Sequence, residues 1–202
     1  MIELLSVVKA FETNVLFDGL TLKIEDGDFL TFTGKSGSGK TTLLNIIGGL
    51  EKPNSGQVLV DGIDIYKSRR KSNYFGKQVS FLFQNFSLIE SKTVKENLDI
   101  IPLKNRSSVS LESALDFVQL KDKMHAKVYT LSGGEQQRVA LARIMLKQSS
   151  IILADEPTGS LDYENGKLVI NKLIELNDNG KTIILVTHDK SIIPGRSKVI
   201  EL

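Results

Sequence analysis

The rest of the sequence can be placed from one glycine-rich segment, Gly34-Lys35-Ser36-Gly37-Ser38-Gly39-Lys40-Thr41. Residues 29–33 before it have the apolar character of a strand, and the apolar residues 43–47 after it predict a helix. A loop of this pattern, G-x-x-x-x-G-K-[ST], lets backbone N–H groups close around phosphates while its lysine offsets their charge. Because the strand and the helix both flank the loop, the sequence favours a nucleotide site over an ordinary glycine-rich turn.

The residues at the end of this loop have distinct expected roles. Lys40 is expected at the phosphates, the Thr41 hydroxyl is suited to ligate Mg²⁺, and Thr42 is expected near the α-phosphate. Lys35 occupies a variable position of the pattern, so we expect its side chain to be solvated. The loop therefore predicts a nucleotide bound together with Mg²⁺.

A second segment predicts the start of a helix, Leu131-Ser132-Gly133-Gly134-Glu135-Gln136-Gln137-Arg138. Ser132 is a good N-cap, Glu135 completes an S-x-x-E capping box, and apolar residues follow at helical spacing. The two glycines predict a flexible notch, and the free N–H groups and positive dipole of a helix start suit an anion. The alternative is an ordinary capped helix.

Three apolar runs read as buried strands, 79–83, 151–154 and 182–186. Polar side chains follow each run within two residues, and these are Gln84, Asp155, Glu156 and His188. Ligands of α/β folds bind at the carboxyl ends of parallel strands. We therefore expect the two acids to face the phosphate loop, and the alternative of solvated acids at a strand end is weaker.

The composition limits the class of protein. The chain has 202 residues and 22.3 kDa, enough for one α/β domain with a full core. Its 26 basic and 24 acidic residues give a net charge of +2, which offers no electrostatic case for nucleic acid. The lack of cysteine excludes disulfides and thiolate metal sites. No apolar run approaches the ~20 residues that cross a bilayer, so we expect a cytoplasmic protein that reaches any membrane through a partner.

The remaining patterns predict further elements. A basic cluster reads as a solvated face rather than a nucleic-acid patch, and it consists of Lys67, Arg69, Arg70 and Lys71. Helices within 85–130 are expected to open on the N-caps Thr93 and Ser110. The other expected elements are strands at 2–8 and 20–24, a hairpin at 53–62, a helix at 163–176 and a last strand at 197–202.

These motifs, taken in order, resemble those of ATP-binding cassette (ABC) ATPases, and the resemblance extends from Phe11 to His188. It implies an α/β fold, a P-loop NTPase cassette with a RecA-like core, an antiparallel β-subdomain and an inserted helical subdomain. We expect a single domain over 1–202 with the helical subdomain at about 86–145, shorter than the family pattern.

The resemblance also assigns roles within one copy. Phe11 matches the aromatic that stacks on adenine, with a core or loop phenylalanine as the alternative. Gln84 matches the glutamine that touches Mg²⁺ or water, and Asp155 matches the acid that holds Mg²⁺ through water. Glu156 matches the general base, and His188 matches the histidine that contacts the γ-phosphate.

Further roles span two copies of the cassette. In the family, the signature segment of one copy contacts the γ-phosphate of ATP held by the other, and the matching residues are Ser132, Gly133, Gly134 and Gln136. Asp162 lies in the loop that crosses the interface. The resemblance therefore implies a homodimer on ATP binding and hydrolysis of ATP to ADP and phosphate.

The segment 155–162 is similar to the lipoprotein-release, macrolide-export and antimicrobial-peptide or bacteriocin branch of the family. This implies export or mechanical work by a separate transmembrane permease, with the chain peripheral on the inner face of the membrane. The alternatives are a soluble cassette acting on nucleic acid or ribosomes, a small-molecule kinase and a non-catalytic binding module. The balanced charge disfavours the cassette acting on nucleic acid or ribosomes. The signature segment and Glu156 disfavour the kinase, and the complete set of catalytic positions disfavours the non-catalytic module.

Overall fold

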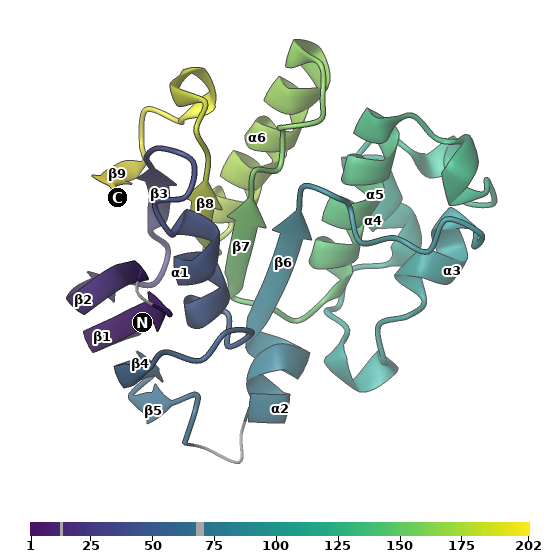
Figure 1. Ribbon diagram of the computed structural model, residues 1–202. Coiled ribbons are helices and arrows are strands. Elements are labelled where there is room, and N and C mark those ends of the chain that lie inside the picture. Colours follow the sequence, from purple (N-terminus) through teal and green to yellow (C-terminus); the bar gives the residue numbers. More distant parts are fainter. Residues whose placement is uncertain (13, 68–70) are drawn as a thin grey trace.

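A five-stranded parallel sheet forms the centre of the molecule in a computed structural model, which describes residues 1–12, 14–67 and 71–202 (Figure 1). Its strands lie in the order β6 (Val79–Phe83), β7 (Ile151–Asp155), β8 (Thr182–Val186), β3 (Phe29–Thr33) and β9 (Lys198–Glu201). β3 and β8 are buried at every position, and β7 at every position before Asp155, as expected for strands covered on both faces of a sheet. The sequence predicted β3, β6 and β8 with these bounds.

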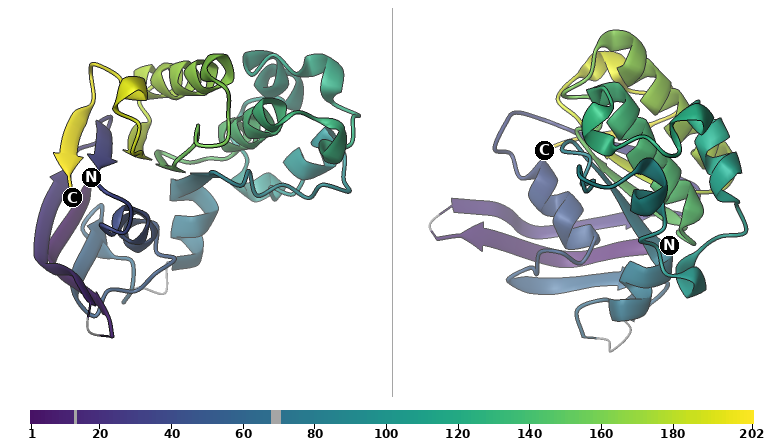
Figure 2. Two further views of the ribbon diagram at one scale, coloured as in Figure 1. Left: turned by 45° about the horizontal axis from the view of Figure 1, so that its top comes forward. Right: turned by 90° about the vertical axis from the view of Figure 1, so that its right-hand side faces the viewer.

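A four-stranded antiparallel sheet lies at one end of the molecule, well separated from the helices α3 (Val94–Leu98) and α4 (Leu111–Phe117) (Figure 2). Its order is β2 (Asn14–Ile24), β1 (Ile2–Phe11), β4 (Ser55–Val60) and β5 (Ile63–Asp64). The predicted strands at 2–8 and 20–24 were too short. Polar residues and a glycine interrupt the apolar alternation of the pair, and the two strands absorb these interruptions as irregularities in their register.

Helix α1 (Lys40–Ile47) packs against both sheets. Its apolar side chains Leu43, Leu44 and Ile46 are fully buried among residues from β1, β3, β4 and β8. The start of α1 directly follows the glycine-rich loop after β3, so packing of the helix fixes the position of that loop.

Helices α5 (Gly133–Leu146) and α6 (Tyr163–Asp178) belong to a second apolar core on the other face of the parallel sheet. Helices α3 (Val94–Leu98) and α4 (Leu111–Phe117) pack on α5 and extend this core away from the antiparallel sheet (Figure 1). The arrangement of a parallel core, an antiparallel sheet and inserted helices agrees with the predicted fold class.

Residues 85–130 contain less helix than the sequence predicted. Thr93 and Ser110 are N-caps, as predicted, and Thr93 forms a full capping box with Glu96. The helices that follow these caps have only five and seven residues, and single 3₁₀ turns occupy 103–105, 121–123 and 128–130. Helices of this length are not stable alone, and packing against α5 holds them in place.

Two smaller features complete the fold. A short helix α2 (Lys71–Asn73) leads into a π-helical turn, Tyr74–Gln78, before β6. Of the predicted basic cluster, Lys67 is exposed to solvent, while Arg69 and Arg70 lie outside the described residues. Within the described parts of the chain, no helix has both the length and the apolar character needed to span a membrane.

Candidate nucleotide site

The glycine-rich loop has a backbone that only glycine adopts easily. Gly34, Gly37 and Gly39 have φ values of 144°, 82° and 93°, in the region that side chains disfavour. Gly39 is also the N-cap of α1, and a Cβ atom there would lie 2.9 Å from the Phe17 ring. The loop therefore exposes the first N–H groups of α1, which have no partner within the helix.

Lys40 provides a buried positive charge beneath this loop. Its side chain is only 7% exposed, and its Nζ donates hydrogen bonds to the carbonyl oxygens of Gly34 at 2.9 Å and Lys35 at 2.8 Å. Among the described residues no carboxylate forms an ion pair with Lys40. A buried ammonium with carbonyl partners and adjacent free N–H groups suits a polyphosphate.

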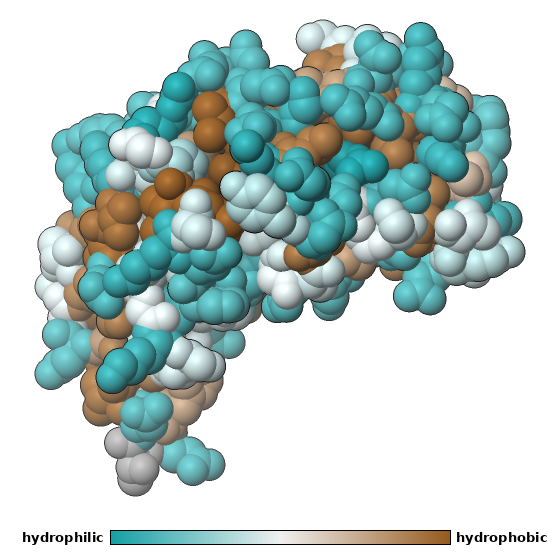
Figure 3. All heavy atoms as spheres, turned by 90° about the horizontal axis from the view of Figure 1, so that it is seen from above, coloured by the Kyte–Doolittle hydropathy of each residue, from teal (hydrophilic) through white to brown (hydrophobic). Residues whose placement is uncertain are grey.

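A cavity of about 520 Å³ opens beside the loop. It brings together ten of the predicted site residues, namely Phe11, Ser36, Gly37, Gly39, Lys40, Thr41, Thr42, Gln84, Glu156 and His188. The cavity is at the carboxyl ends of the parallel strands, where hydrophilic side chains cover much of the surface and hydrophobic ones show between them (Figure 3). Its volume is that of a typical small-molecule site.

Phe11 lines this cavity with a ring that is 47% exposed. It is the last residue of β1 rather than part of a connection, and the Lys9 ammonium lies 4.4 Å from its ring centroid. Leu16 on β2 lines the same wall, which sequence reasoning missed because β2 was predicted to begin at Leu20. The apolar segment 15–17 was the available signal.

Thr41 and Asp155 meet at the bottom of the site. The Thr41 hydroxyl donates a hydrogen bond of 3.0 Å to Oδ1 of Asp155. Burial raises the pKa of Asp155. The hydrogen bond from Thr41 and the charge of Lys40 oppose this shift without cancelling it. A hydroxyl beside a buried and incompletely compensated carboxylate fits Mg²⁺, which takes one or two protein oxygens and completes its shell with phosphates and water.

Glu156 is held in one orientation by the strand beside it. Its backbone has a φ of 44°, unusual for a residue with a side chain, and its N–H donates to the Val186 carbonyl at 2.9 Å. Oε1 of Glu156 accepts the backbone N–H of His188 at 3.0 Å and lies 2.8 Å from Nδ1 of the same histidine. The acid and the histidine are thus fixed together at the cavity edge.

Gln84 follows β6 and lies between this cavity and a neighbouring one that Asp155 lines. A Cβ atom on Gly159 would come within 2.9 Å of the Gln84 amide nitrogen, so the glycine leaves room for this side chain. Gly34, Lys35 and Ser38 belong to the loop without lining the cavity, and Lys35 is exposed as expected.

The signature residues lie away from their own chain's cavity, since none of Ser132, Gly133, Gly134 and Gln136 lines it. The predicted capping box is present, with Ser132 and Glu135 bonded to each other's backbone N–H groups. Both glycines belong to the first turn of α5, at the helix start where the notch was predicted. Gly134 is a close-packing position, where a Cβ would lie 2.4 Å from the Asn165 side chain.

Asp162 is the N-cap of α6 and also lies outside the cavity. Its Oδ1 accepts the Asn165 backbone N–H at 2.9 Å, and its Oδ2 accepts the Asn165 amide at 2.7 Å. The backbone bond from Asn165 is the largest of the effects that lower the pKa of Asp162. In the single chain, Asp162 therefore stabilises the start of α6.

Comparison with known proteins agrees with this geometry. Lipoprotein-releasing system ATP-binding protein LolD of Leptospira interrogans is 41% identical over 96% of this chain and 85% of its own length. Macrolide export ATP-binding/permease protein MacB of Campylobacter jejuni is 39% identical over the whole chain, which spans 33% of the length of MacB. None of these names supports the alternative of a cassette that acts on nucleic acid or ribosomes.

A solved structure shares the fold over the entire chain. It is the dimeric post-hydrolysis state of the ATP-binding cassette MJ0796 bound to ADP and Pi, with a TM-score of 0.87 and 35% identity. The match covers 100% of this chain and 94% of that one. The model of the ABC transporter family matches residues 17–159. The chain therefore belongs to the ABC transporter family, as an ATP-binding cassette.

Proposed function

We propose that this chain is the ATP-hydrolysing subunit of a transport complex in which separate membrane subunits perform export or mechanical work. The observation that carries the proposal is the single cavity that joins the glycine-rich loop to the Glu156–His188 pair. A phosphate-binding loop alone serves many reactions, whereas an oriented acid at the same cavity is suited to activate water.

ATP would be held by groups that already point into the cavity. Lys40 and the first N–H groups of α1 contact its phosphates, and Phe11 offers one ring face to adenine while Lys9 lies against the ring. Thr41 and Asp155 would hold Mg²⁺, with Gln84 as a further contact. When bound, Mg²⁺ would neutralise charge that develops on the phosphoryl oxygens.

Glu156 would accept the proton of the attacking water. His188 holds one carboxylate oxygen through two nitrogens, which leaves the other oxygen free of the histidine and fixes its direction. His188 would also contact the γ-phosphate, and its side chain is exposed enough to do so in the single chain. Preorganised groups of this kind lower the barrier without a cost of reorganisation during the reaction.

A second copy of the chain would complete the site. Ser132 at the start of α5 is exposed, and the signature residues do not line their own cavity. We propose that Ser132, Gly133, Gly134 and Gln136 of one copy close over ATP held by the other, with Asp162 near the interface. The dimeric state described for the MJ0796 cassette supports this arrangement.

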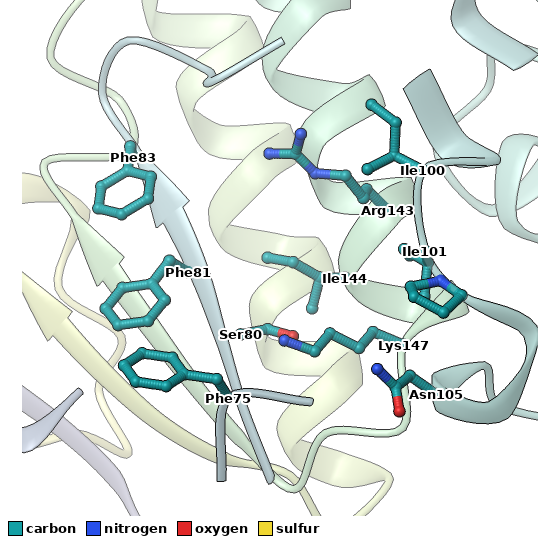
Figure 4. A pocket seen from close by; sticks show the side chains of 11 residues that line it. Phe75, Ser80, Phe81, Phe83, Ile100, Ile101, Asn105, Arg143, Ile144 and Lys147 are labelled. Atoms are coloured by element: carbon teal, nitrogen blue, oxygen red, sulfur yellow. The ribbon is translucent and has the colours of Figure 1, made fainter. Parts of the chain in front are cut away.

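The membrane partner would dock in a groove between β6 and α5 (Figure 4). This groove has a volume of about 370 Å³ and aromatic residues along one wall, including Phe81 and Phe83, which stack on each other. Arg143 of α5 and Lys147, the residue that follows this helix, project from the opposite wall (Figure 4). MacB combines an ATP-binding part and a permease in one polypeptide, and this chain spans a third of the length of MacB. We therefore propose that this chain acts at the inner face of the membrane, bound to a permease.

The transported compound is proposed from relatives only. LolD is named for lipoprotein release and MacB for macrolide export. We propose a cargo of the same broad kind, a lipoprotein, a macrolide or an antimicrobial peptide, moved outward or released from the membrane.

Release of phosphate from Mg-ATP by the purified chain tests the reaction. The unaltered chain should hydrolyse ATP. Glu156→Gln should still bind ATP but hydrolyse it at a rate at least about 10²-fold lower, and Lys40→Met should lose ATP binding. Glu112→Gln on the exposed face of α4 is the matched control and should behave as the unaltered chain. Hydrolysis that continues unchanged in Glu156→Gln would contradict the proposal.

A further inference from the structure

Gln137 is a polar side chain in the middle of an apolar core. It lies on α5 and is fully buried, at 0% exposure. Its amide nitrogen donates to two carbonyl oxygens, that of Pro157 at 2.6 Å and that of Phe83 at 3.3 Å. Among the described residues, its amide oxygen is one of two buried side-chain polar atoms without a partner.

The two carbonyl oxygens determine which way the amide is turned. The opposite orientation would place the amide oxygen against both carbonyl oxygens, where no hydrogen could lie between them. The unpaired oxygen is therefore the consequence of donating to both acceptors. A buried oxygen without a partner is unfavourable for stability, so an apolar side chain of similar length would suit a purely structural position.

Both acceptors are next to residues of the proposed reaction. Phe83 ends β6 immediately before Gln84, and Pro157 immediately follows Glu156. Phe83 and Asp155 are partners in adjacent parallel strands, so the segments that carry Gln84 and Glu156 diverge from the same point. Gln137 bridges these two segments where no backbone bond of the sheet joins them.

The same helix holds the rest of the segment after β6. Arg143 donates to the carbonyl oxygens of Ser87 at 2.7 Å and Phe86 at 3.3 Å. Both residues have left-handed backbones, with φ values of 59° for Phe86 and 49° for Ser87. Segment 83–87 is thus attached to α5 at both of its ends, and α5 begins with the signature residues.

We infer that Gln137 is a positioning residue for hydrolysis, which transmits the position of α5 to Glu156 and Gln84 of the same chain. This inference rests on the proposed function. When the start of α5 closes on the nucleotide of a second copy, the hydrogen bonds of Gln137 position Glu156 and Gln84 at the nucleotide that their own chain binds. Gln137 touches neither the nucleotide nor the water.

Gln137→Met tests this role, because it keeps the length of the side chain and removes both donors. The expected result is a fall in kcat of about 10- to 100-fold, the effect of displacing reacting groups by about 1 Å, with KM for ATP unchanged. The carbonyl of Phe83 keeps a second donor, the backbone N–H of Phe86, so only the Pro157 carbonyl loses its donor. Removal of the unpaired amide oxygen of Gln137 offsets this loss. The melting temperature should therefore change little.

Asn97→Leu is the matched control, since Asn97 is also a fully buried amide bonded to two carbonyl oxygens, but within the α3 region. It should lower the melting temperature and leave kcat within about twofold of the unaltered chain. Gln137→Glu adds a pH readout. Its kcat relative to the unaltered chain should rise as pH falls, because only the protonated acid can donate to a carbonyl oxygen.

The outcomes separate the inference from the proposed function. A kcat within about twofold of the unaltered chain in Gln137→Met would overturn the inference and leave the proposed function intact. A loss of kcat accompanied by a rise in KM and a large fall in melting temperature, as for general damage, would overturn it as well. An unaltered chain that does not hydrolyse ATP would overturn both.

Discussion

Nδ1 of His188 lies 2.8 Å from Oε1 of Glu156, and the backbone N–H of the same histidine donates to that oxygen at 3.0 Å. The histidine side chain is 69% exposed and the glutamate side chain 18% exposed. The acid is therefore largely withdrawn from water, while the imidazole remains open to a ligand. The left-handed backbone of Glu156 is the local strain that keeps this pairing in place.

His188→Gln should lower kcat for ATP by about 10- to 10²-fold, less than the loss expected for Glu156→Gln. The substitution keeps the backbone N–H bond to Glu156 and removes only the imidazole. Phosphate release under saturating ATP measures the effect. His125→Gln, at the only other histidine, is the control because His125 is exposed outside the cavity. Equal rates for both variants would contradict a role for His188.

Asp155→Asn should stabilise the nucleotide-free protein at neutral pH. Burial raises the pKa of Asp155 above its ordinary value of 3.8, so the folded state binds this proton more tightly than the unfolded state does. The free energy of unfolding therefore falls as pH rises from 3.8 through the raised pKa, and the loss persists at pH 7.

Asparagine removes this penalty, so the melting temperature at pH 7 should rise by about 2 °C, with little gain below pH 4. Mg-ATP should reverse the order, because ligand binding stabilises the unaltered chain while Asp155→Asn has lost an Mg²⁺ contact. Thermal unfolding with and without Mg-ATP measures both effects. A variant that is less stable than the unaltered chain without nucleotide would refute the assignment.

Gly134→Ala should destabilise the fold by about 1–3 kcal/mol, although alanine is usually the better helix residue. The new Cβ would lie 2.4 Å from the Asn165 side chain, which also binds Asp162 and Arg138. Gly133→Ala is the matched control, since its nearest neighbour, in Phe86, is at an ordinary 3.6 Å. Denaturant unfolding compares the two variants. The prediction is wrong if both shift stability alike.

Phe11→Leu should raise KM for ATP by about 5- to 100-fold, the range that corresponds to the loss of one base-stacking contact. The maximal rate should change little, because Phe11 is expected to contact adenine rather than the reacting phosphate. Tyr129→Leu replaces another exposed aromatic, outside the cavity, and should have no effect. An unchanged KM in Phe11→Leu would show that this ring does not bind adenine.

Local patterns predicted the parts of the structure that depend on local chemistry. β3 and β8 are short apolar runs bounded by polar residues, and the caps Thr93 and Ser132 satisfy N–H groups three residues away. The acids after the apolar run 151–154 were also predicted to face the phosphate loop, and Glu156 lines the same cavity as that loop. The place of His188 in this cavity was expected from the family resemblance.

The remaining features depend on contacts between distant segments. The exclusion of a side chain at Gly134 comes from Asn165, and the bonds of Gln137 reach Phe83 and Pro157, so neither follows from the helix pattern alone. A signal for Gln137 was present, because it shares the buried stripe of its helix with Leu141 and Ile144. The lengths of β1 and β2 were also underestimated, because the irregular register between these two strands interrupts the apolar alternation of their sequences.

The measurement that tests the account most directly is the solution mass of Glu156→Gln by light scattering, with and without Mg-ATP. A chain that binds ATP without hydrolysing it should accumulate in the closed pair, so the mass should double from 22.3 kDa on addition of Mg-ATP. Adding Ser132→Arg to the same variant should keep the mass at 22.3 kDa while ATP still binds. A mass that stays at 22.3 kDa in Glu156→Gln at saturating Mg-ATP would contradict the shared site.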